Sequence, residues 1–421
     1  MKTALVPAGI GLCIAALLLL GSGGGCSEAV PPALSIEATQ AAADGSNQFA
    51  LDLYAQLPDE GPNVCICPFG VRTALATAYA GARGETARQM AEVLHAGGAA
   101  GQLHRRVSGL SRALRAGAGR AGYEVHTANA LWVQSGYDLL PEFRHTVRGY
   151  YDAQLARADF ATEPEEACRR INGWVGKRTR SRIPRLLDPG ALDRETVLAL
   201  VNAVYLKALW QHEFLPQHTA PGRFRVSEDR SVEVPMMKQT AGFRHGAWEG
   251  GRAVELPYRG AELSMVVLLP DEGRDLEAFA AGLTKAVLAE RLESFQDELV
   301  TVVLPRFKLS WGGRLGDALR DLGMRDAFSR AEADFSGVGG RRGLFLSLVQ
   351  HRTYLAVDER GTEAAAATAA LLKSAVREEN VVRVDRPFLF VIRHVPSSAI
   401  LFIGHVRDPS AGEAAQAQPR Q

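Results

Sequence analysis

The spacing of apolar residues predicts helices in the first part of the chain. In Asn47–Leu57 the apolar side chains recur so that they fall on one side of a helix. Phe69–His95 is also helix-like, with a break near Gly81–Gly84, after which Glu85 suits the first turn of a new helix. These segments predict a helical layer that buries one side against a core.

A strand-like pattern dominates later segments. Ala253–Pro270 reads as two strands joined by a Tyr-Arg-Gly turn, and Thr301–Ser310 alternates apolar and polar residues, with Pro305 marking an edge or an irregularity. Phe388–His394 and Ala399–Val406 flank a Pro-Ser-Ser turn and predict a hairpin. The mixture favours an α+β domain dominated by sheet.

Composition and charge narrow the class of protein further. The 421 residues are 47% hydrophobic and 23% charged, which excludes a disordered polyelectrolyte. With 48 Lys and Arg against 47 Asp and Glu, the formal net charge is +1, so no global field attracts nucleic acid, and we expect none as a partner. Composition does not shift between Asn47 and Pro409, which favours one domain.

The N-terminus has the pattern of an export signal. Met1–Leu20 has a basic start and an apolar run shorter than the ~20 residues of a membrane span. Gly25 directly before Cys26 resembles the lipobox of bacterial lipoproteins, in which the cysteine is lipidated, although Gly23 stands where leucine is usual. Ordinary cleavage and an uncleaved anchor are the alternatives. All three put the folded part outside the cytoplasm, secreted or lipid-anchored, with membrane contact only through the anchor.

Common signatures of catalysis are missing. The chain has no nucleophile elbow, zincin motif or Walker A motif. The glycine-rich Gly117–Gly122 lacks a preceding strand, so we interpret it as a flexible loop rather than a nucleotide site. Cys65, Cys67 and Cys168 lack zinc spacing and are expected to be buried apolar residues. We expect no metal, no cofactor and no catalytic residues.

A basic stretch precedes that glycine-rich segment. A solvated helix face is its simplest interpretation, and a polyanion-binding face is the alternative. The residues concerned are Arg105, Arg106, Arg112 and Arg115, together with Arg120 inside the glycine-rich segment.

One alanine-rich segment, within Val357–Asn380, decides the function. Propensity alone predicts a helix over Thr362–Glu379, because alanine is the best helix former and Thr362 can cap it. An exposed Ala/Thr run after Gly361 is the alternative.

This segment and its surroundings resemble the serpin family. Asp358–Thr368 resembles the hinge of the serpin reactive-centre loop, and Val382–Ile392 resembles the signature that follows the loop. Five further blocks match serpins in the same order: Asn63–Met90, Asn202–Phe214, Val234–Lys238, Leu268–Gly273 and Ile400–Pro409. The resemblance implies a single α+β domain with three β-sheets, a helical bundle and an exposed reactive-centre loop, and it replaces the helix prediction.

The family's function follows as an expectation. Serpins are suicide inhibitors of serine proteases: the loop is cut, an acyl-enzyme forms, and the cut loop enters the central sheet as a new strand. We therefore expect an inhibitor, with a non-inhibitory carrier or chaperone as the alternative. A hydrolase is disfavoured by the missing motifs.

The hinge residues implied by the resemblance suit insertion. An inserted strand alternates its faces, so Thr362, Ala364, Ala366 and Thr368 are expected to face the core, and Glu363, Ala365 and Ala367 to face outward. Small side chains enter a packed interior without the strain of overpacking. Glu359 and Gly361 complete the hinge.

Three further residues are implied to act in sheet opening. Trp210 aligns with the family's Trp at the top of the central sheet, and Asn202 and His351 align with polar residues beneath the strands that separate. His351 is also expected to be a neutral, hydrogen-bonded core histidine. Cys67 and Gly70 stand where serpins commonly have serines, which puts the usual hydrogen-bond cluster in doubt.

Loop length sets the expected cleavage site. The family's usual length from Glu359 places the scissile bond at Ala375–Val376, which fits an elastase-like or subtilisin-like protease. In a shifted register, Leu372 indicates a chymotrypsin-like target, and Lys373 or Arg377 a trypsin-like one.

The expected organisation is a signal peptide over 1–25, a flexible linker over 26–45, a serpin domain over 46–409 with the reactive-centre loop near 359–380, and a disordered tail over 410–421.

Overall fold

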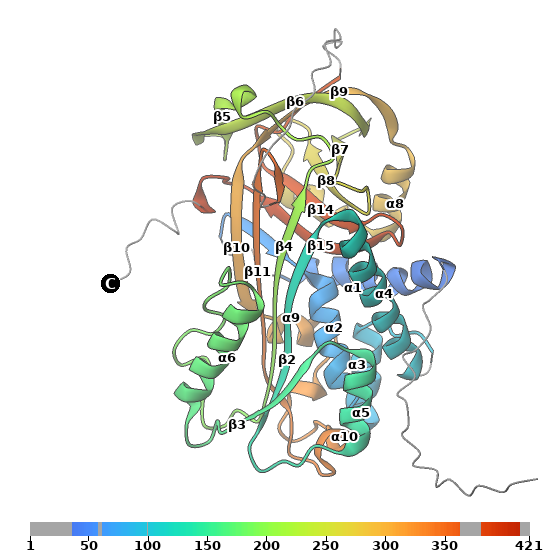
Figure 1. Cartoon of the computed structure of the whole chain (residues 1–421), viewed down its shortest axis with the longest axis vertical. Coiled ribbons are helices and arrows are strands. Elements are labelled where there is room, and N and C mark those ends of the chain that lie inside the picture. The colour runs from blue at the N-terminus through green and yellow to red at the C-terminus, as the bar shows by residue number, and fades with distance from the viewer. Residues whose placement is uncertain (1–35, 58–60, 99, 363–379, 413–421) are drawn as a thin grey trace, which may run out of the picture. The chain divides into compact units, whose positions relative to one another are not determined.

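Two β-sheets organise the residues that the computed structural model describes, which are 36–57, 61–98, 100–362 and 380–412 (Figure 1). The first sheet has six strands and carries the candidate site. Its order is β10 (Phe307–Arg314), β11 (Leu346–Asp358), β12 (Gly361–Thr362), β4 (Leu198–Leu209), β2 (Glu124–Gln134) and β3 (Gln154–Ala158), and β11 also pairs directly with β4.

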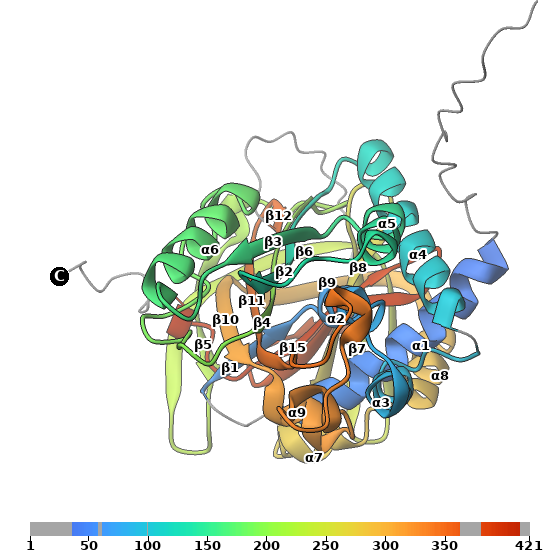
Figure 2. The same ribbon diagram turned by 90° about the horizontal axis from the view of Figure 1, so that it is seen from below.

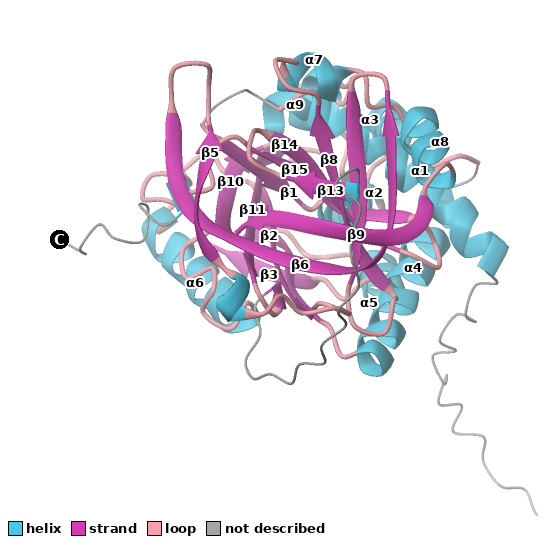
Figure 3. Cartoon of the chain, turned by 90° about the horizontal axis from the view of Figure 1, so that it is seen from above, coloured by secondary structure: helices cyan, strands magenta, loops and turns pink. Residues whose placement is uncertain are grey.

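The second sheet has nine strands. Its order is β1 (Asn63–Ile66), β15 (Ala399–Val406), β14 (Phe388–His394), β8 (Leu263–Pro270), β7 (Gly251–Pro257), β6 (Ser231–Trp248), β9 (Gln296–Pro305) and β13 (Val381–Arg383), with β5 (Ala220–Arg225) paired to β6. The sequence led us to expect three sheets. Two of them are continuous here because the 18-residue strand β6 pairs with β5 and β9 along its length and with β7 at its end (Figure 3).

Helices cover both faces of the six-stranded sheet, with α2 on one face and α6 on the other (Figure 2). The α-helices are α1 (Ile36–Ala55), α2 (Pro68–Tyr79), α3 (Gly84–Val93), α4 (Ala100–Ala121), α5 (Pro141–Tyr150), α6 (Pro164–Arg178), α7 (Leu276–Ala281), α8 (Lys285–Glu293), α9 (Gly316–Asp321) and α10 (Ser336–Gly339). Two short 3-10 helices are Pro216–His218 and Asp326–Phe328.

Alternation along β2 explains this two-sided covering. Leu131 and Val133 belong to the core that includes α2, whereas Ala130 and Trp132 belong to the core under α6. Successive side chains of a strand point to opposite faces, so a strand covered on both sides is apolar at consecutive positions.

Several predicted elements are confirmed. The helix-like segment Phe69–His95 contains α2 and α3 with a break at Ala80–Arg83, and Ala253–Pro270 contains the hairpin β7–β8. β14 and β15 form the predicted antiparallel hairpin. Cys65, Cys67 and Cys168 are buried and free.

The predicted flexible linker over 26–45 is wrong in its second part. Helix α1 begins at Ile36 and buries Ala42 and Ala43 almost completely. Alanines can approach a neighbouring helix or strand closely, so the Ala-rich composition reflects packing rather than a linker.

The predicted loop at Gly117–Gly122 is also wrong. Helix α4 continues to Ala121 and ends at Gly122, whose φ of 73° is the left-handed conformation that commonly terminates helices. Gly117 is needed within the helix, because a Cβ there would lie 2.5 Å from the Tyr123 hydroxyl and 2.6 Å from Glu262.

Thr301–Ser310 contains two strands rather than one. β9 ends at Pro305 in the nine-stranded sheet, and β10 begins at Phe307 in the six-stranded sheet. Pro305 therefore marks the irregularity that its missing N–H predicts.

No described helix has the length and apolar character of a membrane span.

The candidate hinge and sheet-opening region

The short strand β12 lies at one end of the six-stranded sheet, between β11 and β4. Thr362 is opposite Val357 on β11 and Ala208 on β4, and Gly361 is opposite Asp358 and Leu209. Both pairings are antiparallel, and Gly361 and Thr362 are buried. The first two residues of the predicted inserting strand therefore already occupy a strand position.

Below β12, β4 and β11 pair directly with each other in parallel. We call this line of contact the seam; it runs from the pair Leu198–Leu346 to the pair Tyr205–Tyr354. Among the described residues no strand separates β4 from β11 along the seam. Parallel pairing is slightly less stable per residue than antiparallel pairing, so the seam is suited to separation.

Backbone geometry requires glycine at the entry to the seam. Gly361 has a φ of 151°, and a Cβ at this position would clash with the carbonyl oxygen of Ala208 and the backbone of Leu209. Neighbouring backbone groups hold the turn before it: Trp210 N donates to Arg360 O at 2.8 Å, and Phe214 N donates to Glu359 O at 2.7 Å.

Trp210 and Tyr258 form an aromatic pair under the hinge. Their rings are stacked with centroids 4.5 Å apart, and both side chains are almost fully buried. Trp210 Nε1 donates to Asp358 O at 3.0 Å, and the hydroxyls of Tyr258 and Thr362 lie 2.7 Å apart. The pair thus contacts the hinge at both ends of the turn.

Glu359 is a buried carboxylate with two partners. Thr219 Oγ1 donates to it at 2.8 Å, and Arg306 forms an ion pair with it. Burial opposes ionisation of Glu359, but the hydrogen bonds from Arg306 and Thr219 outweigh burial and hold its pKa below the usual value. The carboxylate ties the turn to the start of β10.

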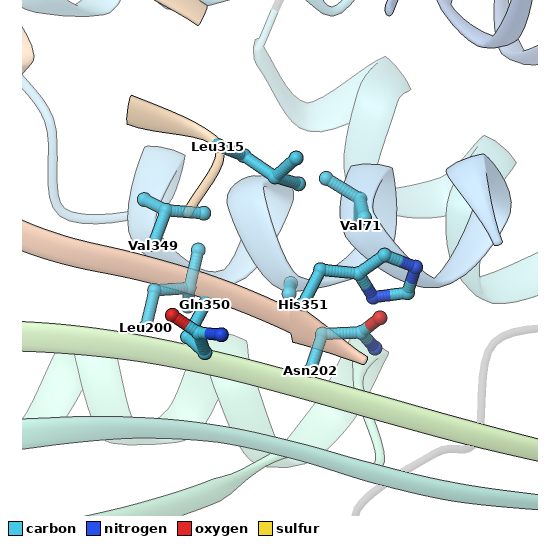
Figure 4. A pocket seen from close by; sticks show the side chains of 8 residues that line it. Val71, Leu200, Asn202, Leu315, Val349, Gln350 and His351 are labelled. Carbon is cyan, nitrogen blue, oxygen red and sulfur yellow. The ribbon is translucent and has the colours of Figure 1, made fainter. Parts of the chain in front are cut away.

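His351 and Asn202 face each other across the seam, as register partners on β11 and β4. Figure 4 shows their side chains next to each other, on the side of Val71 of α2. His351 is fully buried, and its Nε2 accepts a hydrogen bond from Cys67 N at 3.0 Å. Burial lowers the pKa of His351 to about 3, so the imidazole is neutral, as the sequence led us to expect.

Cys67 stands where serpins commonly have a serine, and this difference changes which hydrogen bonds form around His351 and Asn202. Cys67 contributes its backbone N–H, and burial raises the pKa of its thiol to about 12. Gly70 contributes no polar side chain, and a Cβ there would lie 3.0 Å from the amide of Asn202. The Asn202 amide instead donates to Asn129 on β2.

The structure brings Glu359, Gly361, Thr362 and Trp210 together at the hinge, and Asn202 and His351 together at the seam. Glu363–Thr368, the scissile pair Ala375–Val376 and Cys26 lie outside the described residues. Sequence reasoning missed Tyr258, Arg306 and Thr219. Each is far from the hinge along the chain, and Tyr258 carried only a turn signal.

The comparisons with known proteins agree with this geometry. The family model described as "Serpin (serine protease inhibitor)" matches residues 44–409.

The chain belongs to the serpin family.

Relatives support this assignment along nearly the whole domain. The leukocyte elastase inhibitor of Bos taurus is 42% identical over 378 residues, covering 86% of this chain and 98% of the relative. The structure of Serpin48 from the insect Tenebrio molitor is 30% identical, with a TM-score of 0.78, and covers 88% of this serpin and 98% of that chain. The thermophilic serpin tengpin, solved in its native state, is 25% identical with a TM-score of 0.80 and covers 90% and 95%.

Proposed function

We propose that this serpin inhibits an elastase-like or subtilisin-like serine protease by presenting its loop as a substrate and inserting the cut loop into the seam. The position of Gly361 and Thr362 at the head of the β4–β11 seam carries the proposal. A strand that continues from Thr362 along the seam pairs with β11 on one side and β4 on the other. The names of the bovine and human relatives, both leukocyte elastase inhibitors, favour the elastase-like target.

The energy available is sufficient for trapping. Each new backbone hydrogen bond contributes roughly 0.5–1.5 kcal/mol net, so a full strand contributes on the order of 10 kcal/mol. Dragging a docked enzyme along can distort its active site, and loss of one oxyanion-hole donor alone slows a serine protease roughly 10²–10³-fold. Deacylation then stalls, and the protease remains covalently bound.

The test is incubation of the full chain with pancreatic elastase, subtilisin, chymotrypsin and trypsin in parallel. An inhibitor gives an SDS-stable complex of higher mass with at least one protease. Mass spectrometry of the released C-terminal fragment identifies the scissile bond, and a fragment that begins at Val376 supports Ala375 as the specificity residue. Cleavage at Leu372, Lys373 or Arg377 indicates the shifted registers.

A matched variant tests the specificity. Ala375→Arg should transfer complex formation from elastase to trypsin, because a trypsin-like pocket carries a carboxylate. Clipping by every protease without any complex would refute inhibition and favour the carrier or chaperone.

We further propose that the mature protein is lipid-anchored outside the cytoplasm through Cys26. The apolar run before Gly25 and Cys26 supports this proposal. Cys26→Ser should move the protein from the detergent phase to the aqueous phase in a cell-envelope extract. Unchanged partitioning would contradict the anchor and leave plain secretion.

A polyanion is the remaining proposed partner. A common side of helix α4 carries Arg105, Arg112 and Arg115. The guanidinium of Arg106 already donates a hydrogen bond within the protein, from Nη1 to Ala96 O at 3.0 Å. Heparin should accelerate complex formation with a salt-dependent rate, and Arg105→Gln with Arg112→Gln should remove the acceleration. An equal rate with and without heparin would contradict this partner.

A further inference from the structure

A strongly basic segment follows the second half of α6 and the turn after it. Positions 169–185 carry six arginines and one lysine and no acidic residue, although the formal net charge of the whole chain is only +1. All seven side chains are exposed, and we call them the α6 surface: Arg169, Arg170, Lys177, Arg178, Arg180, Arg182 and Arg185. Charge of one sign is therefore concentrated on one short segment of a nearly neutral chain.

The dipole of the helix explains only part of this charge. Lys177 and Arg178 lie in the last turn of α6, where cations stabilise the partial negative charge of a helix C-terminus. The effect falls off within that turn, so it does not account for the three arginines that follow the helix. Those arginines add mutual repulsion, which an external anion would relieve.

Aromatic rings hold two of the guanidinium groups in place. The Cζ atom of Arg170 lies over the ring of Trp132 on β2, 5.7 Å from its centroid, and that of Arg178 lies over Trp174 at 5.9 Å. The two rings pack edge to face with centroids 6.4 Å apart. A guanidinium stacked on a ring keeps most of its in-plane N–H donors available. These two arginines, about two helical turns apart, are thus oriented before any anion binds.

A fixed turn continues the α6 surface beyond the helix. Arg180 and Ser181 have φ values of 50° and 60°, which are uncommon for residues other than glycine. Ser181 N donates to Gly176 O at 2.7 Å, and Ile183 N donates to Thr179 Oγ1 at 3.2 Å. These hydrogen bonds end the helix and direct the chain away from its axis. The row of cations therefore bends after α6.

Neighbouring carboxylates neutralise the α6 surface only in part. Arg170, Lys177 and Arg185 form no ion pair with any residue in the described part of the chain. Three other members do, at N–O distances of 2.7, 3.6 and 2.9 Å respectively: Arg169 with Glu166, Arg178 with Asp152 and Arg180 with Glu124. A positive surface with several uncompensated cations remains.

We propose that the α6 surface binds linear inorganic polyphosphate. Arginine forks match phosphate oxygens in pairs of charge-assisted hydrogen bonds, and a chain of phosphates meets several cations at once. The bend after α6 suits a flexible chain better than a stiff sulfated polysaccharide. Nucleic-acid bases would gain little by stacking here, because Trp132 is buried and Arg178 covers Trp174.

This surface is distinct from the other basic stretch of the chain. Figures 1 and 2 both show α6 and α4 on opposite sides of the described domain. On its inner side α6 packs against the core that includes Tyr205 of β4 and Tyr354 of β11. The site goes beyond protease inhibition and does not depend on it.

The experiment titrates the intact full-length chain, without protease, into end-labelled polyphosphate and follows fluorescence anisotropy. Saturable binding is expected, and the affinity should fall on the order of 10²-fold between about 50 and 200 mM salt, the loss expected for roughly four contacts between cations and phosphates. Orthophosphate should displace the chain only at concentrations on the order of 10²-fold higher, because it lacks multivalency. Oligothymidylate and heparin serve as competitors of other chemistry.

Two matched double variants locate the site. Lys177→Gln with Arg185→Gln removes two exposed cations that have no ion pair among the described residues. It should weaken binding roughly tenfold and lower the slope of log affinity against log salt by about 2. Lys238→Gln with Arg223→Gln, the same loss of charge on exposed positions of β6 and β5, should change neither quantity. Near-ultraviolet circular dichroism confirms that both variants keep the fold.

Four outcomes would overturn the proposal. The first two are the absence of saturable binding and equal losses in the two double variants. The third is displacement by heparin or oligothymidylate at lower concentration than by unlabelled polyphosphate, which would indicate another occupant. The fourth is a larger loss from Arg105→Gln with Arg112→Gln, which would place the polyanion on α4. None of them involves a protease, so failure of this site and failure of inhibition are distinguishable.

Discussion

Replacement of Thr362 by arginine should convert the inhibitor into a substrate. The Thr362 side chain is fully buried between β11 and β4, and its hydroxyl lies 2.7 Å from that of Tyr258. A charge left unpaired in such a site costs about 3–5 kcal/mol. This cost favours a starting state in which position 362 has left the sheet, so insertion must bury the charge again. With about 3 kcal/mol added to the insertion barrier, insertion slows on the order of 10²-fold. Hydrolysis of the acyl-enzyme then precedes trapping.

The assay for Thr362→Arg is the number of serpin molecules consumed per elastase molecule inhibited, with the SDS-stable complex as the product. The expected result is cleaved serpin with active elastase and almost no complex. Thr362→Val is the matched control, since it keeps the shape of the side chain and removes only the hydroxyl, and combining it with Tyr258→Phe avoids an orphaned hydroxyl. A Thr362→Arg protein that traps elastase as well as the parent would refute insertion through this position.

Three further changes probe the same region. Gly361→Ala should expel the hinge at a cost of about 1–3 kcal/mol, because a Cβ clashes with Ala208 O, and a changed Trp210 fluorescence should report it; an unchanged spectrum would contradict the clash. Arg306→Gln should lower the urea midpoint, because loss of a hydrogen bond to the buried Glu359 carboxylate costs about 1.5–3 kcal/mol, whereas Arg223→Gln should not. Burial lowers the pKa of His351 to about 3, whereas an imidazole in the unfolded chain has a pKa of about 6.5. Between these two values the unfolded chain binds one more proton at this residue than the folded protein does. The free energy of unfolding therefore keeps the full contribution of His351 above about pH 6.5 and falls by at most about 1.4 kcal/mol per pH unit from there towards pH 3. Urea unfolding between pH 7 and 4 should show this slope, and His351→Gln should reduce it.

Elements with strong periodicity could be predicted from the sequence. The hairpin β14–β15 and the broken helix α2–α3 followed from apolar spacing and turn residues, since these signals are local. The start of helix α1 at Ile36 could not be predicted from the sequence, because an alanine-rich segment is compatible both with a linker and with a closely packed helix. The end of β9 at Pro305 was visible as an irregularity, but nothing local specified that β10 joins another sheet.

The candidate site was predictable only in part, for a related reason. Gly361 and Thr362 could be placed at the hinge through the serpin resemblance. Tyr258 and Arg306, which hold Thr362 and Glu359, reach the hinge from more than 50 residues away along the chain, as the separations of 104 and 53 positions show. Such partners are defined by the fold, and neither has a spacing pattern that marks it.

The hinge shows why local propensity gave the wrong structure at Thr362. An alanine-rich segment favours a helix when its backbone groups can form hydrogen bonds with one another. Thr362 instead finds strand partners on both sides, at Val357 and Ala208, and a hydroxyl partner at Tyr258. These tertiary contacts outweigh propensity, which differs among ordinary residues by only up to about 0.7 kcal/mol each. The property that makes the following residues good helix formers, their small side chains, also lets them enter a seam without overpacking. Helix propensity and suitability for insertion are therefore two consequences of the same composition, and the available strand partners decide between them.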